Sequence, residues 1–310
     1  MALYDRQTGG GQGNATVVVE ADGAVTLRSS TFDQGSGTHT ILRQIVAEEL
    51  TVPLDAIRVV TLDTDSSPFD GGVGGSRVTH SAGMATIQAA RDAIDKMRDR
   101  AAEIWGIDVE AVVWDNGHAK PAGSNAGEFD PMSFAEIVAG SHSTGGPIAG
   151  HAEINAEGAG NSFGTHVVDV EVDPHTGGVT VLRYLVVQDA GKAVHPSYVE
   201  GQYQGGAAQG IGWALNEEYI YGDDGRLQNP GFLDYRMPVC SDLPMLDSVI
   251  IEIPNPKHPQ GVRGVGEVPL VPSLAAIRNA VYDALGIRFY DLPMSPPKVL
   301  EAMETGEAAE

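Results

Sequence analysis

Apolar and polar residues alternate along this chain in two ways, one typical of strands and one typical of helices. A period of two places alternate residues on one face of a strand, whereas spacings of three and four gather apolar residues on one side of a helix. In the first half these patterns predict, in order, a hairpin of Ala15–Glu20 and Ala24–Ser30 turning at Ala21-Asp22-Gly23, a helix over Thr40–Leu50, a strand over Ile57–Leu62 and a helix over Ser81–Trp105.

Two polar, glycine-containing stretches, Asn116–Gly127 and Ser141–Gly150, are predicted to interrupt the regular structure. After them the patterns predict, in order, strands over Thr165–Val172 and Val179–Val187 joined by a turn at 173–178, a helix over Tyr198–Tyr219, a strand over Ser248–Ile253 and a helix over Val271–Leu285 closed by Gly286. The sequence therefore predicts an α+β protein of two units, residues 1–150 and 151–310, joined near residues 140–160.

Composition narrows the possible functions. Apolar residues make up 42% of the 310 residues, which is typical of a globular protein, and the net charge is −23. So acidic a surface repels a phosphate backbone, which argues against nucleic-acid binding. The only cysteine, Cys240, excludes an internal disulfide and an all-cysteine iron–sulfur site within the chain, and fits a reducing compartment.

The start of the chain and its apolar runs bear on location. Met1–Arg6 shows no basic segment leading into an apolar one, so no signal peptide is predicted. No apolar run approaches the roughly 20 residues that span a bilayer, and we expect a cytoplasmic protein. The glycine-rich run Gly9–Gly13 enters the predicted hairpin with nothing to form a capping layer. This favours a piece of a larger fold, although a disordered tail has the same signature.

Four glycine-rich stretches carry polar side chains that plain turns do not need. The first, Asp33–Thr40, contains Gly35, Ser36, Gly37 and Thr38 and leads into a predicted helix. Backbone N–H groups at a helix start, with hydroxyls beside them, form a nest for an anion. The alternative is an ordinary N-cap.

The second stretch, Gly71–Thr79, has four glycines in five residues and then Ser76 and Arg77 before a helix. Such a backbone suits close wrapping around a phosphate or a dinucleotide. The glycine spacing is not that of a Rossmann fingerprint, so ordinary NAD binding is rejected. A structural loop and a plain nucleotide-binding module are the alternatives.

The third stretch, Gly201–Gly212, places three glutamines among glycines on a predicted helix. An amide both donates and accepts hydrogen bonds, so these side chains suit the mixed edge of a pterin or a base. The alternative is a helix that packs closely through its glycines.

The fourth stretch, Gln260–Pro269, carries Glu267 in an apolar, glycine-lined loop four residues after Arg263. Burial raises the pKa of a carboxyl group and a neighbouring guanidinium lowers it, so this pairing predicts a tuned general base. The alternative is a glutamate on a surface loop.

In this order the four stretches resemble the molybdenum hydroxylase family of xanthine dehydrogenases and aldehyde oxidoreductases. The resemblance runs from about Gly11 to Pro297 and covers the second half of the family's large subunit. The segments that match family motifs are Gly261–Glu267, Ala276-Ile277-Arg278-Asn279-Ala280, Asp283–Arg288, Gly201–Gly212 and Asp234-Tyr235-Arg236-Met237-Pro238.

The resemblance implies a fold and a chemistry. The fold is two α/β subdomains that form the second molybdopterin-binding domain of the large subunit, the later subdomain carrying the catalytic glutamate loop. The chemistry is hydroxylation, with water as the oxygen source, of an N-heterocycle, an aldehyde or a similar electron-poor carbon. Glu267 matches the catalytic base that takes a proton from a molybdenum-bound hydroxyl, while a hydride passes to a sulfido group.

The resemblance also implies a cofactor, molybdopterin cytosine dinucleotide with an oxo- and sulfido-bearing molybdenum. No side chain of the chain is expected to ligate the metal, and Ser36 stands where many relatives have glutamine. The residues expected to contact the cofactor are Gly35, Ser36, Gly37, Thr38, Gly75, Ser76, Arg77, Thr79, Gln202, Arg263, Gly264, Val265 and Gly266.

Implied partners are a chain carrying the other half of the molybdenum-binding subunit, a [2Fe–2S] subunit and an FAD subunit, besides a small-molecule substrate. Two further readings stay open. One is a subunit of a reductive relative of the aromatic acyl-CoA reductase type, and the other is a non-catalytic scaffold or maturation partner of the same fold.

Overall fold

The computed structural model describes residues 1–20, 22–61 and 63–307. It divides the chain into two compact units, one of residues 8–159 with 256–262 and one of residues 1–7, 160–255 and 263–310. We call the first the cradle unit and the second the glutamate unit. Ala21, Leu62 and residues 308–310 lie outside the described residues, so the predicted turn at Ala21 and the end of the strand at Leu62 are not assessed.

The elements that fall mainly in the cradle unit are β2 (Gly11–Val19), β3 (Val25–Ser29), α1 (Thr38–Leu50), η1 (Leu54–Ala56), β4 (Ile57–Thr61), α2 (Val78–Trp105), η2 (Val109–Ala111), β5 (Val112–Asp115), β6 (His118–Pro121), η3 (Gly123–Asn125), β7 (Met132–Ser133), α3 (Phe134–Ala139), α4 (Ser141–Thr144) and β8 (Ile148–Ala156).

The elements that fall mainly in the glutamate unit are β1 (Ala2–Thr8), β9 (Ala159–Val172), β10 (Val179–Asp189), α5 (Pro196–Leu215), η4 (Cys240–Asp242), β11 (Leu246–Ile251), η5 (Val268–Leu270), α6 (Ser273–Leu285) and α7 (Pro296–Thr305).

The cradle unit is a four-stranded sheet of order β4-β3-β2-β8 with α2 packed across β2 and β8 and α1 packed on α2. A Cβ atom at Gly150 of β8 would stand 2.0 Å from the carbonyl oxygen of Ala89, so glycine lets α2 approach the sheet closely. The core of the unit is apolar and includes Val17, Leu27, Leu42, Ile45 and Met97.

Helices α1 and α2 run in the same direction. Ile45 lies against Gly83, and further along both helices Glu49, four residues on in α1, forms an ion pair at 2.8 Å with Arg91, eight residues on in α2. Because the contacts advance along both helices together, the two N-termini lie at the same end of the unit. That end carries the first and second glycine-rich stretches.

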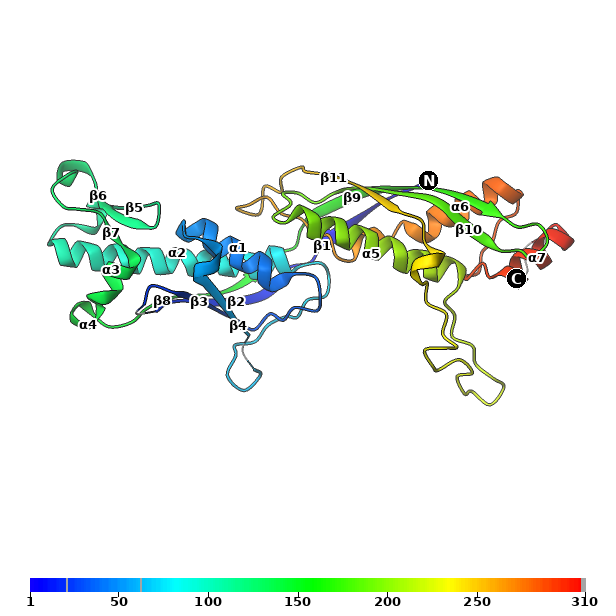
Figure 1. Ribbon diagram of the computed structural model, residues 1–310, viewed down its shortest axis with the longest axis horizontal. Helices are drawn as coiled ribbons and strands as arrows, with labels where there is room; N and C mark the ends of the chain where they lie inside the picture. Colours follow the sequence, from blue (N-terminus) through cyan, green and yellow to red (C-terminus); the bar gives the residue numbers. More distant parts are fainter. Residues whose placement is uncertain (21, 62, 308–310) are drawn as a thin grey trace. The chain divides into compact units, whose positions relative to one another are not determined.

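The glutamate unit is built on a sheet of order β1-β9-β10-β11. β9 and β10 are antiparallel and β10 and β11 are parallel. Helix α5 packs on β10 and β11 and also contacts η5 and α6 (Figure 1). Tyr184, Tyr203, Ile211 and Ile277 belong to one buried core cluster.

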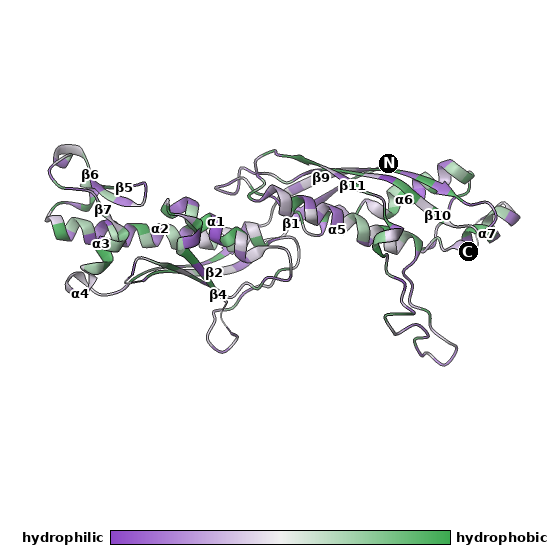
Figure 2. Cartoon of the chain, in the orientation of Figure 1, coloured by the Kyte–Doolittle hydropathy of each residue, from purple (hydrophilic) through white to green (hydrophobic). Residues whose placement is uncertain are grey.

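Most predicted elements are confirmed to within a few residues, and both units carry the expected alternation of hydrophobic and hydrophilic positions (Figure 2). Three predictions are corrected. The stretch Asn116–Gly127 contains β6, because Asn116 and Gly117 both have positive φ angles and make a tight hairpin turn from β5. The stretch Ser141–Gly150 holds α4 and the start of β8. The helix predicted to end at Tyr219 ends at Leu215, and the chain continues from there as an irregular segment.

The two units are not separated by a single boundary near residue 150, because each contains more than one segment of the chain. β1 pairs with β9 and so belongs to the later unit, whereas β8 pairs with β2 and stays in the earlier one. Residues 256–262 also return to the cradle unit. In the described part of the chain, none of the helices combines the length and the apolar character that crossing a bilayer requires.

Candidate functional site

The predicted site residues of the cradle unit lie at the N-termini of α1 and α2. Neither helix has an acidic residue in its first turn, and neither N-cap residue makes a side-chain capping bond. The loops before the two helices are joined, since the Thr31 hydroxyl donates to the Asp70 carboxylate at 2.8 Å. We call residues 33–38 and 71–79 together the glycine cradle. Two helix ends of positive polarity favour a negatively charged group there.

The first loop of the cradle is held by Asp33. Its carboxylate accepts hydrogen bonds from the amides of Gly35 at 2.8 Å and Gly37 at 3.1 Å, and a third from His39. Partial burial raises the pKa of Asp33, but these amides outweigh it and leave the pKa below its usual value. The expected nest is therefore filled by the loop's own carboxylate. What the loop still offers a ligand is the hydroxyl of Ser36, which lies 3.1 Å from the hydroxyl of the buried Thr38.

The second loop leaves space beside its backbone. Apart from its chain neighbours, a Cβ atom at Gly72 or Gly74 would meet no atom of the described residues within 4 Å. Gly75 and Ser76 both have positive φ angles, and that of Ser76 is 54°. A serine in the left-handed region is uncommon, so the backbone of this loop is strained at Ser76.

Arg77 does not face this open side. It is buried, its guanidinium donates to the carbonyl oxygen of Gln12, and it lies against Gly11 and Gly71. A Cβ atom at Gly71 would stand 1.9 Å from an Arg77 nitrogen, so this glycine makes room for the arginine. The expectation that Arg77 contacts the cofactor is corrected: its side chain braces the loop.

Two buried histidines lie next to Thr79: His80, which follows it in the first turn of α2, and His258. The rings of His80 and His258 are 5.5 Å apart, and His80 Nε2 lies 3.0 Å from the carbonyl oxygen of Glu157. Burial, and the nearby His80, lower the pKa of His258 to about 4, and burial also lowers that of His80. Both rings are therefore neutral at pH 7 and add no positive charge to the cradle.

Glu267 lies in the glutamate unit and precedes the short helix η5, whose Val268 and Pro269 are buried. Its side chain is 44% exposed and forms an ion pair with Arg6 of β1. From the sequence, Arg263 is predicted to be the guanidinium that neighbours the Glu267 carboxylate. That expectation is wrong, because the guanidinium of Arg263 is committed to a different carboxylate.

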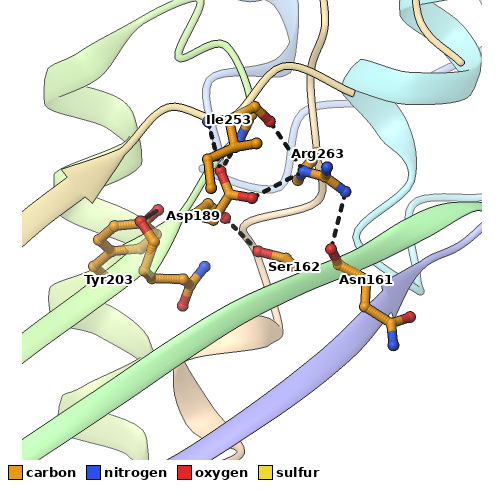
Figure 3. A network of polar contacts seen from close by, with 8 residues as sticks. Asn161, Ser162, Asp189, Tyr203, Ile253 and Arg263 are labelled. Carbon is orange, nitrogen blue, oxygen red and sulfur yellow. Dashed lines mark hydrogen bonds and ion pairs between the residues drawn. The ribbon is translucent and has the colours of Figure 1, made fainter. Parts of the chain in front are cut away.

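Arg263 forms a buried ion pair with Asp189, at 2.9 Å between Nε and Oδ2 (Figure 3). The arginine also donates to the carbonyl oxygens of Asn161, at 2.9 Å, and Ile253. The other oxygen of Asp189 accepts from the amides of Gly191 and Ile253, at 2.8 and 3.0 Å. The pair thus ties the ends of β10 and β11 to the chain that leads to Glu267.

The rest of the glutamate loop is partly anchored. Gly264 is buried, Val265 packs against the core cluster, and Gly266 is exposed beside Glu267. Arg263 and Val265 therefore hold the loop from inside, which leaves Gly266 and Glu267 as its outward part.

Helix α5 uses its glycines in two ways. Gly206 and Gly210 are packing contacts, since a Cβ atom there would stand 2.5 Å from Pro269 and 2.1 Å from Ser273. Gly201 and Gly205 face open space. Gln202 is half-buried one turn before Gly206, on the side of α5 that packs on η5. Gln202 and the Glu267 loop therefore belong to one part of the glutamate unit.

The predicted site residues thus fall in two sets, one in each unit. The structure brings the first and second stretches together in the cradle unit, and it brings the third stretch and residues 263–269 of the fourth together in the glutamate unit. Sequence reasoning missed Asp33, Asp189 and Arg6. The signal for Asp189 was a polar pair, Gln188-Asp189, at the end of a buried strand; Arg6 carried no signal.

Comparison with known proteins decides the family. A family model described as a molybdopterin cofactor-binding domain matches residues 2–244. The chain belongs to this family. This confirms the resemblance seen in the sequence, and it confirms the α+β fold class.

Curated relatives and solved structures agree. The chain is 35% identical over 292 residues to a putative xanthine dehydrogenase molybdenum-binding subunit of Escherichia coli, covering 93% of this chain and 39% of the relative. It is 33% identical to the nicotine 6-hydroxylase large subunit of Paenarthrobacter nicotinovorans, covering 93% and 36%. Quinoline 2-oxidoreductase of Pseudomonas putida 86 matches with a TM-score of 0.87 and 27% identity, covering 98% of this chain and 42% of the other. The chain thus spans about two fifths of the length of these proteins.

Proposed function

We propose that this chain is the part of a molybdenum-binding subunit that cradles the molybdenum cofactor and supplies the catalytic base, Glu267. The assembled enzyme oxidatively hydroxylates an electron-poor carbon, with water as the oxygen source. The observations that carry the proposal are two adjacent, glycine-lined helix starts without acidic residues in their first turns and, in the other unit, an outward glutamate held by Arg6, in a chain of the molybdopterin cofactor-binding family.

The cradle fits the cofactor's anionic groups. Positions 35, 72 and 74 have open space where a side chain would stand, and neither helix has an acidic residue in its own first turn. The hydroxyl of Ser36, backed by the buried Thr38, the backbone at 72–76 and the side chain of Thr79 would hold phosphate oxygens and pterin edges. Gln202 and the backbone at 264–266 of the glutamate unit are proposed as further cofactor contacts.

When bound, the cofactor supplies two-electron redox chemistry. The chain's own contribution is proton transfer: an Oε atom of Glu267 accepts a proton from the water-derived nucleophile. Arg6 forms an ion pair with that carboxylate and so orients it. The buried Arg263–Asp189 pair keeps the loop in place while the charge on Glu267 changes.

The finer assignments are proposals that rest on the names of relatives and on the resemblance seen in the sequence. Two of them are named for nicotine and quinoline, both N-heterocycles, and we propose an N-heterocycle as the substrate, with an aldehyde as the second choice. We propose the cytosine dinucleotide form of molybdopterin. We propose assembly with the remainder of the molybdenum-binding subunit, a [2Fe–2S] subunit and an FAD subunit, in the cytoplasm.

The test is metal and nucleotide analysis of the purified complex that contains this chain. We expect molybdenum in the complex, and CMP released on acid hydrolysis. A complex without molybdenum contradicts the proposal and leaves the scaffold reading. A panel of N-heterocycles and aldehydes with an oxidising dye separates the hydroxylase from a reductive relative, which would turn over only with a reduced donor.

A further inference from the structure

One segment of the glutamate unit has no role in the function proposed above. Residues 217–242 leave the end of α5 and form a long arm that extends away from the sheet (yellow-green in Figure 1) before the chain returns to β11. We call them the arm. The arm contains the segment Asp234–Pro238, which the sequence analysis singled out as a match to a family motif.

The base of the arm is fixed by specific polar contacts. The Tyr235 hydroxyl donates to the Glu217 carboxylate at 2.8 Å, and this bond raises the pKa of Tyr235 to about 12. The side-chain amide of Asn229 spans the two strands of the arm, donating to the carbonyl oxygen of Glu218 at 2.7 Å and accepting from the amide of Ile220 at 3.0 Å. Lys298 of α7 forms an ion pair with Glu218. These contacts give the base of the arm a defined conformation.

The outer part of the arm is apolar and uncovered. Phe232 and Leu233 are 104% and 97% exposed, and Tyr219, Tyr221 and Met237 are each more than half exposed. Several of these side chains line one groove of about 600 Å³, in which Arg236 is the only charged residue. The exposed apolar side chains are thus gathered along one surface.

The exposed area of this surface reaches that of the largest apolar patch on a typical monomer. At about 150–250 Å² for each fully exposed aromatic side chain, Phe232, Tyr219 and Tyr221 alone expose roughly 350–600 Å². The largest apolar patch on a typical monomer is about 300–600 Å² and is often a binding site. A groove rich in aromatic residues and methionine with one arginine has the composition of a protein–protein interface, and the arm also exposes the carboxylates of Asp223, Asp224 and Asp234.

The comparison with relatives indicates what covers the apolar surface of the arm. The solved relative shares the fold of 98% of this chain, yet the chain covers only 42% of that relative. The family model extends through residue 244 and so includes the whole arm. The arm thus belongs to the matched stretch, and more than half of such a subunit lies outside that stretch and is able to cover an apolar surface on it.

We infer that the arm, residues 217–242, docks the part of the molybdenum-binding subunit that lies outside this chain. This inference rests on the proposed function for the identity of the subunit. Phe232 and Leu233 fill apolar pockets of that partner, and the exposed carboxylates of the arm face a neutral or basic surface.

The test is site-specific photo-cross-linking in the assembled enzyme. The photoreactive residue p-benzoylphenylalanine replaces Phe232, the purified complex is irradiated, and cross-linked peptides are identified by mass spectrometry. The matched control places the same residue at Tyr290, which is an aromatic residue 80% exposed in the same unit and outside the groove. We expect cross-links from position 232 to sequences of the molybdenum-binding subunit beyond these 310 residues, in several-fold higher yield than from position 290.

Cross-links from position 232 to a second copy of this chain, to an iron–sulfur subunit or to an FAD subunit would overturn the inference. So would the absence of cross-links, or equal yields at positions 232 and 290. The molybdenum content of the same preparation separates the two proposals. A loaded complex without the expected cross-link sinks the docking surface alone, and a cross-linked complex without molybdenum sinks the proposed function alone.

Discussion

The two parts of the candidate site, the glycine cradle and the loop that carries Glu267, are held in opposite ways. In the glycine cradle, carboxylates of the loops themselves, Asp33 and Asp70, accept from nearby backbone amides over two to six residues. Around Glu267 the supports come from far along the chain: Asp189 fixes Arg263, and Arg6 reaches Glu267 from a position 261 residues earlier.

This difference fits the part that the proposed function gives to each loop. If the cradle binds through its backbone, short-range turns are enough to shape it, and its glycines leave room for a ligand. If one side chain of the glutamate loop does the chemistry, its position must be fixed, and the sheet and a buried ion pair do this. Each loop can therefore be disturbed separately, and the effects should differ in kind.

The largest effect on stability is expected from Asp189→Asn. The change keeps an oxygen for the amides of Gly191 and Ile253 but leaves the buried guanidinium of Arg263 without its counter-charge. The free energy of unfolding should fall by about 3–5 kcal/mol, measured by urea denaturation. Asp169→Asn, which breaks the exposed Arg183–Asp169 pair in the same sheet, is the control and should cost less than about 1 kcal/mol. Equal losses would contradict the account of the loop.

Next is the dependence of stability on pH. Burial lowers the pKa of His166 in the glutamate unit and of His258 in the cradle unit to about 4. Their unfolded values are near 6.5, so the unfolded chain binds protons first as the pH falls. Stability should be full above about pH 6.5 and should decrease towards pH 4, by about 3 kcal/mol for each histidine. His166→Asn and His258→Asn should each flatten this dependence, and an unchanged slope in both variants would refute it.

A pair of glycine variants separates packing from binding in the cradle. Gly71→Ala drives a Cβ atom into the buried Arg77 and should cost about 1–3 kcal/mol of stability. Gly74→Ala has open space and no positive φ, so it should change stability by less than about 0.5 kcal/mol. We expect Gly74→Ala to lower the cofactor content of the complex all the same. Full molybdenum content in Gly74→Ala would show that the ligand does not use this backbone.

The smallest effect on stability is expected from Arg6→Gln. The Arg6–Glu267 pair is more than a third exposed, and such pairs contribute about 0–1 kcal/mol. The informative readout is the turnover of the assembled complex, which should fall several-fold because the Glu267 carboxylate loses the contact that orients it. Arg6→Lys should restore most of this turnover. Unchanged turnover in Arg6→Gln would remove Arg6 as a positioning residue.

The sequence predicted the elements and the candidate loops well where the determinants are local. Helix α1 and the β9–β10 hairpin follow from apolar spacing and turn residues. The turn Asn116-Gly117 was also a local signal, but the short strands beside it have too little apolar pattern to stand out in a polar stretch.

Partners that depend on strand pairing could not be predicted. Arg263 is four residues from Glu267 in the chain, yet it pairs with Asp189 because the ends of β10 and β11 bring that carboxylate beneath the loop. Arg6 reaches Glu267 because β1 joins the later sheet. Arg77 looked like a ligand to phosphate, but glycines at 11 and 71 accommodate its side chain inside the unit.

The central claim is that Glu267 is the proton acceptor of a molybdenum-dependent hydroxylation. The direct measurement is the turnover of the assembled complex carrying Glu267→Gln, with molybdenum content and unfolding measured on the same preparation. The account predicts normal metal content, normal unfolding and turnover lowered by ~10² or more. Turnover close to that of the unaltered complex, at equal metal content, would contradict it.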